Sequence, residues 1–252
     1  MARTLTLILI FLLSACKGSN VDTPNTSDSG TNSPDADYAV LMFGNSHTAL
    51  HNLPAVLARL IELGTGKSAT VVKGPGNDFL NDRSTTGSSF TSLSSRQWSH
   101  VVLQGQKYSQ SHTVTYSTTK AEEWVRLVRD NDALPVMYPE HPQRGVTLEV
   151  EFLHELYSGI ARRAGACVAP ISHAWGMAVE DFPHNYLYSA DGNHFNGRGA
   201  FFTAMILFSV ITQSSAQALP FVEDVDVNAD DQARMREYVD AVMASYPPCQ
   251  YI

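Results

Sequence analysis

Three residues of this sequence carry side chains that could together break an acyl bond: Ser46, Asp191 and His194. A serine hydroxyl becomes a nucleophile when a histidine accepts its proton, and a carboxylate can orient that histidine and stabilise its charged form. Because Asp191 and His194 stand three residues apart, both can face one point from a single loop. The same loop could instead be a turn in which Asn196 caps a helix, which is the commoner use of such residues.

Ser46 stands between a predicted strand and a predicted helix. Residues 38–43 are a short apolar run that favours a buried strand, and the amphipathic stretch 53–63 favours a helix. Gly44 allows a backbone conformation that a side chain would resist, and the N–H groups of a helix N-terminus would favour a developing anion at Ser46. The alternative is an ordinary loop in which Ser46 or Thr48 caps the helix. The presence of both patterns, one at each end of the domain, favours catalysis.

The two patterns resemble the blocks of the SGNH (GDSL-like) hydrolase superfamily, with Gly44-Asn-Ser46 far upstream of Asp191-x-x-His194. Asn45 stands where that superfamily usually has Asp, a variation that it tolerates. The resemblance covers roughly residues 38–213. It implies a flavodoxin-like α/β/α domain and ester hydrolysis by Ser46, His194 and Asp191.

The resemblance also implies an oxyanion hole made by the N–H of Ser46, the N–H of a glycine and a side-chain amide. For the glycine, Gly76 is the first choice and Gly74 the second, although a Pro-Gly turn without a ligand is an alternative. The usual Asn of the third block is absent, and Gln104-Gly-Gln106 stands there, similar to several carbohydrate O-acetylesterase branches. A Gln amide can donate the same hydrogen bond, so Gln104 is expected as the donor and Gln106 as the reserve.

About five short strands alternate with helices, which predicts a parallel sheet covered on both sides, a three-layer α/β/α sandwich. The candidate residues follow the carboxyl ends of strands, where ligands bind in open α/β sheets. Glu140 and His141 also follow a strand and could contact a substrate, although a capping or solvated role is commoner. Further strands are expected at 68–73, 101–103, 134–138 and 166–170, and further helices after Thr119 and at 147–165, 201–211 and 228–245.

Residues 1–15 predict the signal peptide of a lipoprotein. A basic residue precedes the apolar run 5–13, which is too short for a confident spanning helix. Leu13-Ser-Ala-Cys16 resembles a bacterial lipobox, which implies cleavage before Cys16 and lipidation of its thiol; a plain secretory signal is the alternative. Lys17 follows, and the absence of Asp there favours the outer membrane, at its periplasmic or surface face, in a bacterium with two membranes.

After the lipidated Cys16, residues 16–37 are rich in Ser, Thr, Asn, Asp, Gly and Pro, so they predict a flexible tether. A single hydrolase domain is expected over 38–252, held at the bacterial cell envelope by the lipid anchor. Cys167 and Cys249 could form a disulfide outside the cytoplasm, or remain one buried and one exposed thiol; the sequence leaves this open.

The formal net charge of −8 over 252 residues argues against nucleic acid as a partner. The nine histidines are scattered, and no His-x-x-x-His with a partner Glu occurs, so neither a metal nor an organic cofactor is expected.

The sequence therefore predicts a serine esterase that removes a small acyl group, in the first place acetyl, from a carbohydrate. A lipase or thioesterase of the same superfamily is an alternative, although loops rich in Ser, Thr and Asn favour a polar alcohol. An alternative of another class is a non-catalytic surface lipoprotein that binds glycans.

Overall fold

The structure, a computed structural model, describes residues 36–252 apart from residue 112. The predicted signal peptide, Cys16 and nearly all of the tether lie outside the described residues. Asp37, expected in the tether, is already bound to the domain, because its carboxylate accepts hydrogen bonds from the N–H and hydroxyl groups of Ser68 at 2.9 and 2.6 Å.

One parallel sheet forms the centre of the domain, and its strands lie in the order β2-β1-β3-β4-β5. Every neighbouring pair is parallel, which confirms the predicted fold class. The direction of winding reverses between β1 and β3, and in such sheets ligands bind outside the carboxyl ends at this point. The strands are β1 (Tyr38–Phe43), β2 (Ala69–Lys73), β3 (His100–Gln104), β4 (Leu134–Tyr138) and β5 (Cys167–Val168).

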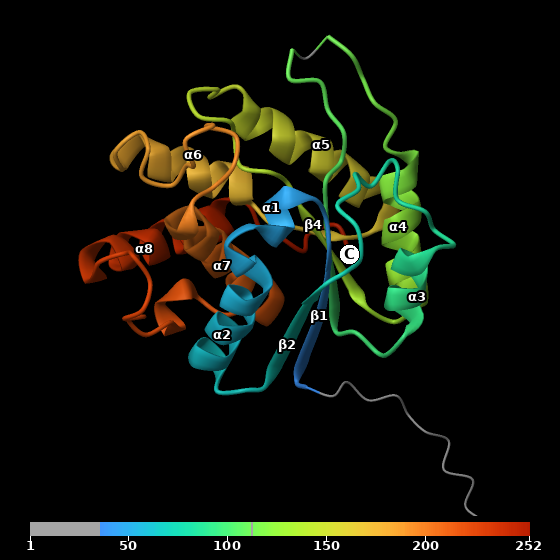
Figure 1. The fold of residues 1–252 in the computed structure, drawn as a ribbon, viewed down its shortest axis with the longest axis horizontal. Helices are drawn as coiled ribbons and strands as arrows, with labels where there is room; N and C mark the ends of the chain where they lie inside the picture. The colour runs from blue at the N-terminus through green and yellow to red at the C-terminus, as the bar shows by residue number, and fades with distance from the viewer. Residues whose placement is uncertain (1–35, 112) are drawn as a thin grey trace, which may run out of the picture. The chain divides into compact units, whose positions relative to one another are not determined.

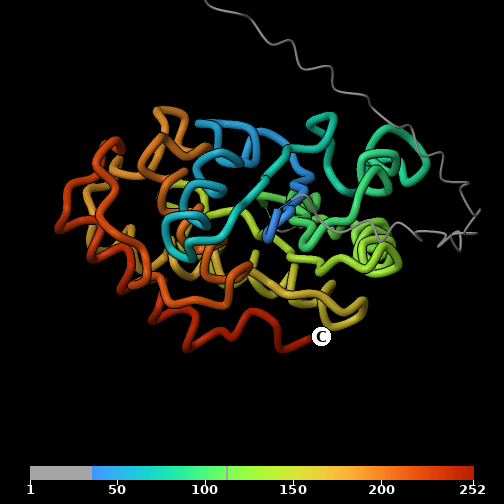
Figure 2. The backbone as a smooth tube through the Cα atoms, turned by 90° about the horizontal axis from the view of Figure 1, so that it is seen from below, coloured from blue at the N-terminus to red at the C-terminus, as the bar shows by residue number. Residues whose placement is uncertain are grey.

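Helices cover both faces of the sheet. Figure 1 shows α2, α7 and α8 on one side of the strands and α3 and α4 on the other, and Figure 2 shows the same two layers from a second direction. The α-helices are α1 (Ser46–Ala49), α2 (Leu53–Thr65), α3 (Ser88–Ser94), α4 (Thr119–Asp130), α5 (Glu149–Ala164), α6 (Ile171–Asp181), α7 (Gly197–Thr212) and α8 (Ala229–Ser245), with short 3₁₀ turns at Leu50–Asn52 and Ala216–Ala218.

The apolar strands supply a core on each face, because successive side chains of a strand point to opposite sides. From β1, Val40 and Met42 pack with α2, α6, α7 and α8, whereas Leu41 and Phe43 pack with α3, α4 and α5. This double burial explains why 38–43 is apolar throughout rather than alternating. Most expected elements agree with the structure within two residues, but α7 begins four residues before Phe201 because Asn196 caps it.

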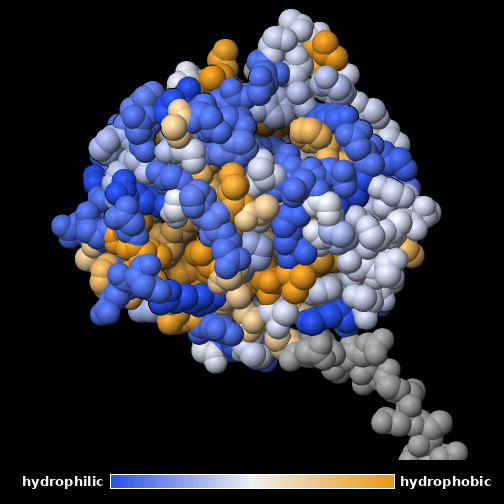
Figure 3. All heavy atoms as spheres, in the orientation of Figure 1, coloured by the Kyte–Doolittle hydropathy of each residue, from blue (hydrophilic) through white to orange (hydrophobic). Residues whose placement is uncertain are grey.

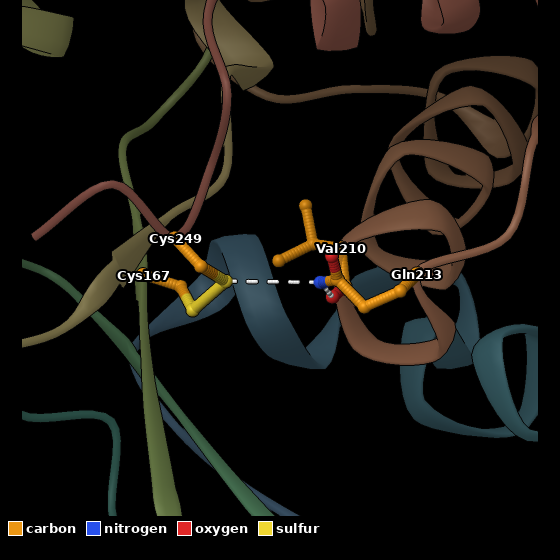
Figure 4. The surroundings of a disulfide bond; sticks show 4 residues. All are labelled: Cys167, Val210, Gln213 and Cys249. Atoms are coloured by element: carbon orange, nitrogen blue, oxygen red, sulfur yellow. Dashed lines mark hydrogen bonds between the residues drawn. A yellow bond between two sulfur atoms is a disulfide. The ribbon is translucent and has the colours of Figure 1, made fainter. Parts of the chain in front are cut away.

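A disulfide joins Cys167 in β5 to Cys249, 82 residues further along the chain (Figure 4). Next to it, the N–H of Val168 donates to the carbonyl of Pro248 at 2.7 Å. The side-chain amide of Gln213, which follows α7, lies 3.7 Å from the sulfur of Cys249. The C-terminal segment is thereby attached to the edge of the sheet.

Removing the disulfide should destabilise the domain. Cys249→Ala is expected to lower the free energy of unfolding by about 2 to 4 kcal/mol, because the cross-link restricts a long loop of the unfolded chain. Denaturant unfolding measures this loss, and dithiothreitol should reproduce it in the wild-type protein. The variant should be insensitive to the reductant; equal unfolding curves for the variant and the wild type would contradict the prediction.

Hydrophilic residues cover most of the face drawn in Figure 3, and apolar residues appear on it in several separate places. None of the helices in the described part of the chain has the length and apolar composition needed to cross a bilayer.

Candidate active site

Ser46 is the first residue of α1, after a tight turn at the carboxyl end of β1. The backbone of Gly44 is not in the left-handed region, contrary to the conformational reason inferred from the sequence. A Cβ atom at Gly44 would instead lie 2.3 Å from Oε1 of Gln104 and 2.5 Å from Cγ2 of Thr48. Glycine is therefore required here by lack of space between the turn and β3.

The sequence indicated that Ser46 lies at the N-terminus of the long amphipathic helix. The structure differs, because Ser46 belongs to a separate short helix. A 3₁₀ turn that contains two left-handed residues, His51 and Asn52, separates the four-residue α1 from α2. Neither Ser46 nor Thr48 caps α1, because Asn45 does so by accepting from the N–H of His47 at 3.1 Å. Ser46 consequently begins the short α1 and not the longer α2.

The structure brings Ser46, His194 and Asp191 into one line of hydrogen bonds. Oγ of Ser46 lies 2.8 Å from Nε2 of His194, although the two residues are 148 positions apart. Nδ1 of His194 lies 2.6 Å from Oδ2 of Asp191. With the imidazole proton on Nδ1, facing the carboxylate, Nε2 is free to accept the serine proton.

A short, internally bonded loop holds the Asp191 carboxylate in place. Its Oδ1 accepts from the backbone N–H groups of Asn193 and His194, both at 3.0 Å. The hydrogen bond from the His194 ring, followed by those from the backbone, lowers the pKa of Asp191, so it is ionised at neutral pH. The expected alternative is also present, because Asn196 accepts from two N–H groups at the start of α7. The loop therefore both caps a helix and aims a histidine.

His47 lies beside the His194 ring, and His141 lies beside His47. The ring centroid of His47 is 5.0 Å from that of His194 and 5.2 Å from that of His141, which stacks on Trp175. Burial lowers the pKa of His47 well below its ordinary value and that of His141 to about 4. Both rings are neutral at pH 7. Sequence reasoning missed His47, for which the only signal is its position next to Ser46.

The structure distinguishes the two glycines proposed for the oxyanion hole. Gly74 is buried, and its N–H donates to the carbonyl of Met42 at 2.8 Å, so it continues the pairing of β2 with β1. Gly76 is exposed with φ of 75°, and a Cβ atom there would lie 2.5 Å from Oδ2 of Asp78. In the described residues, no acceptor bonds the N–H of Gly76 or that of Ser46. Both groups remain available to a substrate.

Arg83, which no sequence pattern indicated, links the Gly76 loop to the nucleophile turn. Its buried guanidinium donates to the carbonyls of Pro75, Asp78 and Gly44 at 2.6, 3.2 and 3.3 Å. The same group lies over the ring of Phe43, 5.0 Å from its centroid. These contacts fix the loop after β2 relative to the end of β1.

Gln104 does not present its amide to a substrate, which corrects the expectation that it donates to the oxyanion. The side chain is fully buried. Its Oε1 accepts from the N–H of Asn45 at 2.9 Å, and its Nε2 donates to Oε1 of Glu140 at 2.6 Å. The side-chain amide of Gln104 therefore holds the backbone of the nucleophile turn by a buried hydrogen bond and does not line the active site.

The reserve, Gln106, is fully buried as well. Its Nε2 donates to the carbonyls of Lys107 and Ser117, at 2.9 and 3.3 Å. Asn81 connects the same loop to the one after β2, since it accepts from the N–H of Lys107 and donates to the carbonyl of Ser117. Gln106 thus shapes the loop after β3.

Glu140 and His141 have neither the substrate contact nor the solvated role that the sequence suggested. Both are buried, at 5% and 2% exposure. Burial raises the pKa of Glu140 and outweighs the hydrogen bonds from Tyr157 and Gln104, which lower it. The resulting pKa is about 7.

A cavity of about 590 Å³ lies elsewhere, between α5, α6 and α8. Arg144 and Tyr188 in its lining are close to the Asp191 loop, but Ser46 and His194 do not line it. We place the candidate site at Ser46, because a nucleophile, a base and an orienting carboxylate meet there.

Comparisons with solved structures find proteins that share this fold. A protein from Slackia heliotrinireducens, presented as a candidate SGNH hydrolase, is 22% identical and matches 68% of this chain and 97% of its own, with a TM-score of 0.53. The chain has the fold of an SGNH hydrolase. A DUF4886 family protein from Bacteroides uniformis is 15% identical over 83% of this chain and 95% of its own, with a TM-score of 0.57.

An acetyl-xylooligosaccharide esterase from Geobacillus shares the fold at 11% identity, over 74% of this chain and 98% of its own, with a TM-score of 0.54. No family model matches the sequence, and no curated protein matches it.

Proposed function

We propose that the protein is a serine esterase that hydrolyses small acyl esters, in the first place acetyl esters of carbohydrates, through an acyl-enzyme. The observation that carries this proposal is the line of hydrogen bonds from Ser46 through His194 to Asp191, at 2.8 and 2.6 Å. The fold that the chain shares with SGNH-like and esterase structures also supports it.

In the proposed reaction, the hydroxyl of Ser46 attacks the ester carbonyl while Nε2 of His194 accepts its proton. Asp191 holds the imidazole by Nδ1 and stabilises the imidazolium that forms. His194 then returns the proton to the departing alcohol, which leaves an acyl group on Ser46. Water, deprotonated by the same histidine, attacks this ester and releases the acid and the free serine.

The proposed oxyanion donors are the N–H groups of Ser46 and Gly76, which have no acceptor in the described residues. Backbone donors that are fixed before the reaction stabilise the charge that develops on the carbonyl oxygen. Arg83 donates to the carbonyls of Pro75 and Gly44, so it links the loop of the second donor to the turn of the first.

Two polar loops support a carbohydrate as the alcohol component. Residues 77–87 and, residue 112 apart, residues 105–118 follow β2 and β3 and so flank the carboxyl end of β1. They contain many hydroxyl and amide side chains, and Lys107 pairs with Asp82 between them at 2.7 Å. The acetyl-xylooligosaccharide esterase with the same fold agrees with this substrate class.

Turnover of p-nitrophenyl acetate by the purified protein tests the proposal. Activity that falls steeply from acetyl to octanoyl esters, with acetate release from acetylated xylan, would support a carbohydrate acetylesterase. A maximum at long chains would favour the lipase or thioesterase alternative. Binding of the polysaccharide without turnover of any ester would favour a non-catalytic glycan-binding lipoprotein.

We also propose that Cys16 carries lipid chains that anchor the protein at the bacterial cell envelope, at the outer membrane where there are two membranes. The disulfide between Cys167 and Cys249 fits a compartment outside the cytoplasm.

Cys16→Ser is expected to move the protein from the membrane fraction to the soluble fraction, because a residue without a thiol cannot be lipidated at this position. Fractionation of cells and labelling with a palmitate analogue measure the effect. Cys249→Ser is the matched control and should keep the membrane attachment. A wild-type protein found wholly in the soluble fraction would contradict the anchor.

A further inference from the structure

A buried chain of hydrogen bonds leads from the nucleophile turn to the end of β4. The N–H of Asn45, the residue before Ser46, donates to Oε1 of Gln104 at 2.9 Å. Nε2 of Gln104 donates in turn to Oε1 of Glu140 at 2.6 Å. The Asn45 peptide is therefore held by a side chain whose own orientation depends on a carboxylate.

The second carboxylate oxygen of Glu140 also accepts a buried hydrogen bond. Oε2 accepts from the hydroxyl of Tyr157 at 2.8 Å, and that hydroxyl accepts from the N–H groups of Gly105 and Gln106 at 3.1 and 2.8 Å. Tyr157 is fully buried in α5. Glu140 therefore collects donors from β3 and α5, although no cation is bonded to its carboxylate in the described residues.

We propose that Glu140 is a positioning residue for the esterase reaction: through Gln104 it fixes the Asn45 peptide and thereby aims Ser46 at His194. This inference rests on the proposed function. It assigns a task to a buried acid that neither contacts the substrate nor belongs to the line of Ser46, His194 and Asp191.

The chemical reason is that a carboxylate can only accept hydrogen bonds, whereas an amide both donates and accepts. Glu140 thus forces the Nε2 end of Gln104 towards itself and leaves Oε1 facing the N–H of Asn45. With the amide reversed, an N–H group would face another N–H group at the turn. A buried donor without an acceptor is costly, so the turn would move.

Glu140→Gln tests this logic with almost no change in shape. The new amide offers one acceptor to two donors, the hydroxyl of Tyr157 and Nε2 of Gln104, so one of them must turn away. We expect kcat for p-nitrophenyl acetate to fall on the order of 10²-fold, because a small misplacement of the nucleophile has effects of this size. KM should change by less than about threefold, since no substrate contact is lost. The assay is run at pH 8, above the pKa of Glu140 near 7.

The double variant Glu140→Gln with Gln104→Glu supplies the rescue. A carboxylate at position 104 accepts from the N–H of Asn45 and from the new amide, whose oxygen accepts from the hydroxyl of Tyr157. Every hydrogen bond of the chain is restored with the two groups exchanged. We expect kcat to return to within about tenfold of the wild type, a recovery that independent structural damage would not produce.

Glu149→Gln is the matched control. Glu149 is equally buried, at 1% exposure, and also accepts from a tyrosine hydroxyl, that of Tyr108, and from the N–H of Gln143. It has no hydrogen bond to the nucleophile turn among the described residues. This variant should lose stability like Glu140→Gln, as thermal unfolding reports, but should keep the wild-type kcat.

Amide hydrogen exchange gives a readout that does not depend on catalysis. Peptides that cover Gly44 to Ser46 should exchange faster in Glu140→Gln, and at the wild-type rate in the double variant. If the wild-type protein is inactive but shows this exchange pattern, the proposed esterase function is refuted, whereas the conclusion that Glu140 holds the nucleophile turn stands. An active wild-type protein whose kcat and exchange are unchanged in Glu140→Gln would overturn the inference and leave the esterase intact. A loss of kcat that the double variant does not reverse would also overturn it.

Discussion

Ser46→Ala, His194→Ala and the double variant are expected to lose nearly the same amount of activity, roughly 10⁴- to 10⁶-fold in kcat, because residues that act as one unit give non-additive effects. Nε2 of His194 lies 2.8 Å from Oγ of Ser46. Without the base the hydroxyl keeps its proton, and without the hydroxyl the base has no nucleophile to activate. Rates with p-nitrophenyl acetate for the three variants measure this directly.

A fluorophosphonate probe gives an independent test, since it reacts with an activated serine and does not require turnover. The probe should modify Ser46 in the wild-type protein, and His194→Ala should slow the labelling severely. Ser95→Ala, at an exposed position after α3, is the control and should be labelled like the wild type. Rapid labelling at another serine, with full activity in Ser46→Ala, would show that the resemblance extends to the fold alone.

The strands and their order were predictable because their signals are local. Each strand is a short apolar run closed by polar or glycine-rich residues, and alternation with helices leaves a parallel sheet as the consistent arrangement. Ser46 and His194 were predictable for a related reason, since each belongs to a compact block of neighbouring residues. Their approach across 148 positions follows from the sheet, which gathers the loops at one edge.

The roles of Gln104 and Glu140 could not be predicted in the same way. The side chain of a glutamine after a buried strand can either face the substrate or be buried in the protein. Its orientation depends on hydrogen-bond partners that are distant in the sequence. Here the N–H of Asn45 lies 59 positions from Gln104, and Glu140 lies 36 positions from it. No period or spacing reports such pairs. Arg83 is a second example, because its acceptors are backbone carbonyls and carry no residue-specific signal.

The Gly44 turn shows a finer limit of sequence reasoning. The glycine itself was predictable, but its reason was wrong: the space is taken by Gln104 and Thr48, not by a left-handed backbone. The separation of Ser46 from the amphipathic helix was missed likewise, because two left-handed residues, His51 and Asn52, precede that helix and neither is a glycine. Both errors arise where tertiary contacts, rather than local propensity, determine the conformation.

Asp191→Asn is expected to lower kcat by about 10²- to 10⁴-fold, less than the loss of Ser46, because the carboxylate orients the base and forms no bond to the substrate. The mechanism of the loss follows from the hydrogen bonds of Asp191. Its Oδ1 accepts from the N–H groups of Asn193 and His194, so the single oxygen of an asparagine would remain there. The asparagine N–H₂ would then face Nδ1 of His194, and the imidazole would have to accept at Nδ1.

An imidazole that accepts at Nδ1 carries its proton on Nε2, which faces Ser46 and can no longer take the serine proton. The fluorophosphonate rate of Asp191→Asn should therefore fall together with kcat, while KM and the unfolding curve change little. Asn193→Ala is the matched control on the same loop, since only its backbone N–H bonds Asp191, and it should keep the wild-type rate. Full activity in Asp191→Asn would mean that another group orients His194, and would remove Asp191 from the mechanism.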